Sequence, residues 1–70
     1  MWTVELTADY RGPYGRIVTD YRTQRTRTAL EAVTVADHHW QRVGRRRGTQ
    51  LHLRATADTG ETVTRSYRRD

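Results

Sequence analysis

The middle of the chain, residues 28–44, reads TALEAVTVADHHWQRVG. Thr28 and Glu31 have the spacing of a capping box, in which each side chain binds a free backbone amide at a helix start. Gly44 is a typical residue at which a helix stops. Between these ends the apolar residues recur at helical spacing: Leu30, Val33, Ala36, Trp40 and Val43, with Ala29 and Ala32 beside them. We therefore expect one amphipathic helix over residues 28–43.

Strands are expected on both sides of this helix. Residues 2–10 and 49–57 alternate between apolar and polar side chains, which is typical of half-buried strands. Two further strands are expected at about residues 16–23 and 62–68. Turns at residues 11–15, which contain Gly and Pro, and at residues 58–61 would join each pair of strands.

The alternation gives each strand an inner face toward the helix. In three strands the expected inner residues are Trp2, Val4, Leu6, Ala8, Tyr10, Leu51, Leu53, Ala55, Ala57, Val63 and Tyr67. In the second strand they are Ile17, Thr19 and Tyr21, with Val18, Asp20 and Arg22 pointing outward. Arg65 also falls on an inner face, which suits an edge strand or the end of the sheet.

The order β-β-α-β-β predicts a two-layer α+β fold, with one helix packed on a four-stranded sheet. Seventy residues fit a single small domain, residues 1–70. The element order resembles the ubiquitin roll of small immunoglobulin-binding domains, in which the two terminal strands pair in parallel at the centre. A purely antiparallel sheet is the alternative. The likeness is one of element order alone, and it transfers no function.

The net charge of +5 is concentrated in one stretch. Residues 38–57 carry five arginines and no acidic residue, whereas the other fifty residues carry eight arginines and eight carboxylates. All 13 cationic residues are arginine, and lysine, asparagine and phenylalanine are absent. This bias is typical of a GC-rich genome, such as that of an actinobacterium or one of its phages. Codon usage therefore accounts for arginine in place of lysine as well as side-chain geometry does.

Composition also bears on the compartment. The chain has no cysteine, which excludes disulfides and thiolate metal sites. No segment approaches the roughly 20 apolar residues that span a membrane, and the N-terminus lacks the pattern of a signal peptide. We expect a cytoplasmic protein without membrane contact. Formation of a homodimer is one way in which so small a core could gain stability.

The candidate binding site is the basic stretch itself: Arg42, Arg45, Arg46, Arg47 and Arg54. Guanidiniums at a helix end and in a loop between glycines can follow the phosphates of DNA or RNA, and they can equally meet an acidic protein surface. The alternative is a solvated helix end, where cations suit the helix dipole.

Two ways of reading bases are disfavoured. Sheets that bind single strands display aromatic rings outward, whereas here Trp2, Tyr10, Tyr21 and Tyr67 are expected to point inward. The single helix has Glu31 on its outward face, and Asp37 as well, which would oppose insertion into a major groove. Contact with phosphates is therefore favoured over recognition of base sequence.

Two smaller candidates lie outside the basic stretch. Arg22, Arg25 and Arg27 precede the helix start, where free backbone amides favour anions, and they form a possible secondary anion site. The alternative is a polar linker. Tyr14, at the tip of the first hairpin, could stack on a base or contact a protein, or could pack on its own hairpin.

Catalysis and metal binding are not expected. His38 and His39 point about 100° apart on a helix, and His52 lies on a different element, so no metal site is expected. The sequence has no nucleophile motif, phosphate-binding loop or carboxylate dyad, and no cofactor is expected. The chain is therefore interpreted as a non-enzymatic protein that contacts nucleic-acid phosphates. One alternative is a phage- or plasmid-type effector that binds an acidic host protein or pairs with itself, and the third is a small nuclease or toxin.

Overall fold

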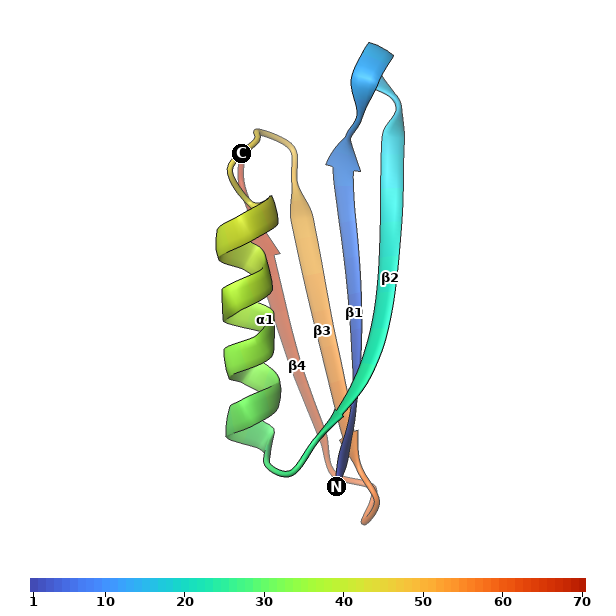
Figure 1. The fold of residues 1–70 in the computed structure, drawn as a ribbon, viewed down its shortest axis with the longest axis vertical. Coiled ribbons are helices and arrows are strands. Elements are labelled where there is room, and N and C mark those ends of the chain that lie inside the picture. Colours follow the sequence, from blue (N-terminus) through green and yellow to red (C-terminus); the bar gives the residue numbers. More distant parts are fainter.

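The helix and all four strands form close to where the sequence predicts them. The computed structural model describes residues 1–70, the side chain of Pro13 excepted. Its elements are β1 (Trp2–Arg11), the short 3-10 helix η1 (Pro13–Gly15), β2 (Ile17–Thr26), α1 (Ala29–Val43), β3 (Gln50–Ala57) and β4 (Thr62–Arg68). The expected β-β-α-β-β order is confirmed, and α1 lies on one face of the sheet in a two-layer α+β fold (Figure 1).

The sheet is antiparallel throughout, in the order β2-β1-β3-β4. The antiparallel alternative is thus correct and the ubiquitin-roll arrangement is wrong, because β1 pairs with β3 and not with β4. Side-chain burial explains the choice. The helix-facing residues of β3 include the buried Leu51 and Leu53, whereas β4 places the exposed Arg65 on that face. A strand with a charged inner residue is tolerated at an edge, where β4 lies.

The expected inner face of β2 is wrong. Ala8 pairs with Asp20 and Leu6 with Arg22, and directly opposed residues share a face of the sheet. The helix side of β2 therefore carries Val18, Asp20, Arg22, Gln24 and Thr26. Its other side carries Ile17, Thr19 and Tyr21, on the face of the sheet opposite α1, which we call the open face. Ile17 is 74% exposed and Tyr21 is 58% exposed. Hydrophobicity did not set this register, because α1 leaves most of β2 uncovered and so neither of its faces is deeply buried.

The core lies under α1 and draws on β1, β3 and the helix. Its buried apolar residues are Val4, Leu6, Ala8, Ala32, Ala36, Leu51, Leu53 and Ala55. Trp2, Tyr10, Trp40 and Tyr67 pack around them. Figure 1 shows α1 on the side of β3 and β4, with β2 at the far side of the sheet. Since β2 contributes no residue to this apolar cluster, space remains between it and the helix.

Both ends of α1 are fixed by specific contacts. The Thr28 hydroxyl accepts from the Glu31 amide at 3.1 Å, and the Glu31 carboxylate accepts from the Arg27 amide at 3.1 Å. Thr28 is therefore the expected N-cap. At the other end the Gly44 amide donates to the Trp40 carbonyl at 2.7 Å. A Cβ on Gly44 would lie 2.6 Å from the Trp40 ring, so this glycine is required for close packing and not for a left-handed backbone.

Candidate functional site

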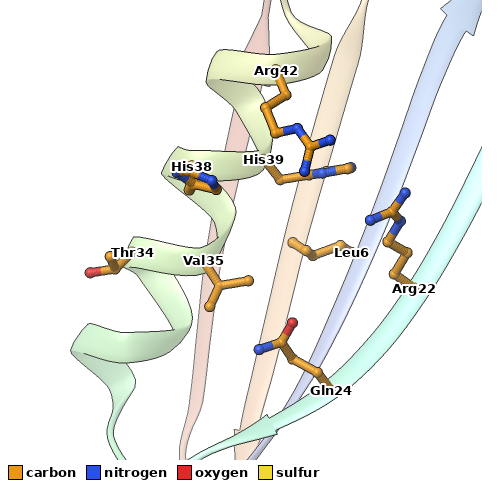
Figure 2. Close-up of a pocket in the computed structure, with 8 residues that line it drawn as sticks. All are labelled: Leu6, Arg22, Gln24, Thr34, Val35, His38, His39 and Arg42. Carbon is orange, nitrogen blue, oxygen red and sulfur yellow. The ribbon is translucent and has the colours of Figure 1, made fainter.

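A groove runs between α1 and β2 because the helix packs toward the other side of the sheet. One part of it has a volume of about 400 Å³ and is lined by Leu6, Arg22, Gln24, Thr34, Val35, His38, His39 and Arg42. Leu6 forms an apolar floor, and Arg22 from β2 and Arg42 from α1 both point toward the His39 ring (Figure 2). The two walls of the groove thus each supply a guanidinium.

A second hollow continues this groove past the end of the helix. Its volume is about 430 Å³, and it shares Arg22 and Arg42 with the first part. It adds Tyr10, Asp20, Val43, Arg45 and Arg46. We refer to the two parts together as the basic groove. Its four cations are Arg22, Arg42, Arg45 and Arg46, and among the lining residues that the structure describes Asp20 is the one carboxylate.

The single carboxylate does not neutralise the groove. Asp20 Oδ2 lies 3.4 Å from Arg22 Nε, and both side chains are substantially exposed. An exposed ion pair of this kind is worth about 0–1 kcal/mol, so a stronger anion can replace it at small cost. Three arginines of the groove remain outside this pair. The groove therefore favours a ligand with several negative charges.

His39 reports the electrostatic character of the groove. It is buried, 9% exposed, although it lies on the helix face that lines the groove. Burial lowers the pKa of His39 below its ordinary value, and the neighbouring charge of Arg22 lowers it further, partly opposed by Asp20. The lowered pKa favours the neutral form of the His39 ring, so the positive charge of the groove comes from its arginines.

The arginine loop after α1 is anchored by the C-terminal residues. The Gly48 amide donates to the Arg69 carbonyl at 2.7 Å, and the Arg69 amide donates to the Thr49 carbonyl at 3.0 Å. Arg69 Nε also donates to the Gly44 carbonyl. These contacts hold both ends of the loop that carries Arg45 and Arg46. Sequence reasoning missed this role of Arg69, because the contact joins segments that lie far apart in the chain.

The structure separates the five arginines of the basic stretch. Arg42, Arg45 and Arg46 line the basic groove. Arg47 is exposed in the same loop, but it is not among the lining residues that the structure describes. Arg54 lies on the open face of the sheet, opposite Glu5, because alternate residues of a strand point to opposite faces. The four-stranded sheet thus lies between Arg54 and the groove.

The possible secondary site at Arg22, Arg25 and Arg27 is also divided. Arg22 lines the basic groove. Arg25 lies on the open face, where its Nη2 is 3.4 Å from Asp58 Oδ1. Arg27 follows the strand, and its amide donates to Glu31. The division arises because β2 continues to Thr26, so successive residues of the expected linker alternate between faces.

Tyr14 stands alone at the tip of the β1–β2 hairpin. Its side chain is fully exposed, and its backbone φ of 65° lies in the left-handed region. It therefore does not pack on its own hairpin. It is also not among the described residues that line the basic groove.

The histidines lie on two faces of the molecule. His38 and His39 line the basic groove, whereas His52 lies on the open face and hydrogen-bonds with Ser66, Nδ1 to Oγ, at 3.2 Å. Among the described residues, no group of three or more His, Cys, Asp or Glu side chains is placed to hold a metal ion. Nor does any described helix have the length and apolar character needed to cross a membrane.

Comparisons with known proteins identify no relative of this chain. The chain matches no family model, no curated protein and no solved structure. The geometry of the groove is therefore the basis for the proposals below.

Proposed function

We propose that this protein is a non-enzymatic nucleic-acid-binding protein that holds the phosphates of a single strand in the basic groove. The observation that carries the proposal is the convergence of four arginines from three separate segments, β2, α1 and the loop after it. A solvated helix end accounts for Arg42, but it does not account for Arg22, which arrives from the other wall. Like charges gathered in one groove repel each other, and a polyanion removes that cost.

The dimensions of the groove favour a single strand over a duplex. Each part has a volume of about 400 Å³, in the range of sites for small ligands. A nucleotide backbone can enter such a groove, whereas a duplex can only lie across its rim. Val35, together with the small exposed parts of Leu6 and His39, supplies apolar surface against which sugars and bases can pack. Recognition through phosphates and stacking carries little base specificity.

Binding of a labelled oligonucleotide tests the proposal. A fluorescein-labelled 12-nucleotide oligo-dT, and its oligo-U counterpart, are titrated at low salt and followed by fluorescence anisotropy. Arg42→Ala and Arg45→Ala should each weaken binding. Arg54→Ala is the matched control, since it removes the same charge from the opposite face of the sheet.

The outcomes separate the proposal from its rivals. Weakened binding in the two groove variants, with Arg54→Ala near wild type, supports the groove as the site. Equal weakening in all three variants would show that net charge alone matters. Absence of binding to either oligonucleotide at low salt would overturn the proposal. Circular dichroism of each variant confirms that the fold is retained.

A further inference from the structure

The second strand leaves one edge of the sheet open. β2 is ten residues long and ends the sheet, so its outer backbone edge has no neighbouring strand in the part of the chain that the structure describes. Exposed edges of this length are usually protected by proline, bulges or charges, because their free amides and carbonyls pair with other strands. Residues 17–26 contain no proline, and the β1–β2 ladder runs without a bulge from Trp2 to Arg11, so the charged residues Asp20, Arg22 and Arg25 are the one protection of these three kinds on this edge.

The charges on β2 are arranged so that they complement a second copy. When a strand pairs with its own copy in antiparallel fashion, directly opposed residues must lie on the same face of the sheet. A two-fold axis between two residues would oppose residues from different faces, so the axis must pass through a residue position. With the axis at Tyr21, Asp20 lies opposite the partner's Arg22, and the reverse pair repeats on the other side of the axis. Opposite charges directly across two strands are stabilising.

The same charges penalise the neighbouring registers. An axis at Asp20 would place two carboxylates opposite each other, and an axis at Arg22 would oppose two guanidiniums, which is destabilising. An axis at Tyr21 also opposes Thr19 to the partner's Thr23 and Ile17 to the partner's Arg25, with no like charges across residues 17–25. The pattern therefore favours one register among those that the strand could adopt.

The open face gives a second reason for this register. Tyr21 is 58% exposed and Ile17 is 74% exposed, although both are large and apolar. In the register centred on Tyr21 the two tyrosine rings meet across the axis, and Ile17 lies against the aliphatic stem of Arg25. Cross-strand aromatic pairs and arginine stems that cover apolar surface both stabilise sheets.

We propose that two copies of this chain pair antiparallel through β2 about Tyr21, which joins their sheets into one of eight strands. A two-fold axis perpendicular to the sheet keeps both α1 helices on the same face. The two basic grooves then lie side by side, separated by the paired β2 strands. The pairing stands on the edge strand and its charges, and it does not require that the groove bind nucleic acid.

Cysteine cross-linking tests the register directly, because the chain has no cysteine of its own. Across the axis the two copies of residue 21 would have Cα atoms about 4.5–5.5 Å apart, within the range that a disulfide requires. Tyr21→Cys should therefore give a covalent dimer under mild oxidation. Thr23→Cys is the control: the two copies of residue 23 would be displaced along the strand by about 13 Å, and no cross-link should form.

A double variant completes the cross-linking test. Thr19→Cys combined with Thr23→Cys places each cysteine opposite a cysteine of the partner, so covalent dimers should return. Cross-linking of Thr23→Cys alone, or no cross-linking of either Tyr21→Cys or the double variant, would overturn this register.

Charge exchange tests the pairing without cysteine. Sedimentation velocity of the wild-type chain should show a dimer. Asp20→Arg opposes two arginines on each side of the axis, and Arg22→Asp opposes two carboxylates, so each should give monomers. The double exchange, Asp20→Arg with Arg22→Asp, restores opposite charges and should restore the dimer. A wild-type chain that stays monomeric at high concentration, or single variants that remain dimeric, would overturn the proposal. Neither result would bear on oligonucleotide binding by the groove.

Discussion

Raising the salt concentration should weaken oligonucleotide binding by an amount that the groove itself sets. Four arginines line the basic groove, and each phosphate neutralised on a single strand contributes about −0.7 to the slope of log K against log salt. The expected slope is therefore about −2.8, and affinity should fall about 50-fold between 50 and 200 mM salt. Removing one contact with Arg42→Ala should reduce the slope to about −2.1 and the loss to about 18-fold.

The slopes are measured by fluorescence anisotropy of labelled oligo-dT at four or five salt concentrations, for the wild type and each variant. Arg54→Ala serves as the control, because its side chain lies on the open face and should leave the slope near −2.8. A wild-type slope shallower than about −1 would mean that phosphate contacts do not drive binding. An unchanged slope in Arg42→Ala, or an equal change in Arg54→Ala, would refute the assignment of the phosphates to the groove.

Three further predictions concern the contacts that hold α1 in place. Gly44→Ala should lower the free energy of unfolding by about 1–3 kcal/mol in urea, because the new Cβ would lie 2.6 Å from the Trp40 ring; an unchanged midpoint would contradict this packing. Burial and the hydrogen bond to Asp37 raise the pKa of Tyr67 to about 12, so its contribution to stability should be full below about pH 10 and lost between pH 10 and 12. Tyr67→Phe should lack that loss in denaturation curves measured across this range. Burial lowers the pKa of His39, so the unfolded chain binds its proton first and stability should fall as pH drops below about 6.5; His39→Gln should show a smaller fall.

The sequence predicts the helix and the central strands well because their signals are local and strong. Thr28 and Glu31 show the capping pattern, and the structure has the Thr28 cap at the expected place. β1 and β3 alternate cleanly because one face of each is buried against α1, as at Val4 and Leu51. In such strands the alternation of apolar and polar residues follows which side chains are buried, so the alternation alone predicts the inner face.

The face of β2 could not be predicted in this way, because the helix leaves most of that strand uncovered. Its apolar residues Ile17 and Tyr21 are exposed, so their spacing says nothing about the core. This affected the candidate site as well. The sequence groups Arg22 with Arg25 and Arg27 in a possible secondary anion site and predicts that it points away from the helix, whereas the β1–β2 register carries it into the groove beside Arg42. The length of the hairpin turn sets the β1–β2 register, and this register determines the face on which Arg22 lies.

Arginines that are close in the sequence therefore do not all lie on the same face of the sheet. Arg54 shares the basic stretch with Arg42 but lies across the sheet from it, and Arg22 comes from another element yet faces the same groove. The strand period of two makes this arrangement sensitive to the turn: a slip of one residue in β2 would exchange Arg22 for Tyr21 on the helix side. At Gly12, whose amide donates to the Arg16 carbonyl at 2.7 Å, an added Cβ would lie 2.8 Å from Val18. The close hairpin turn thus fixes the register, and through it the charge of the groove.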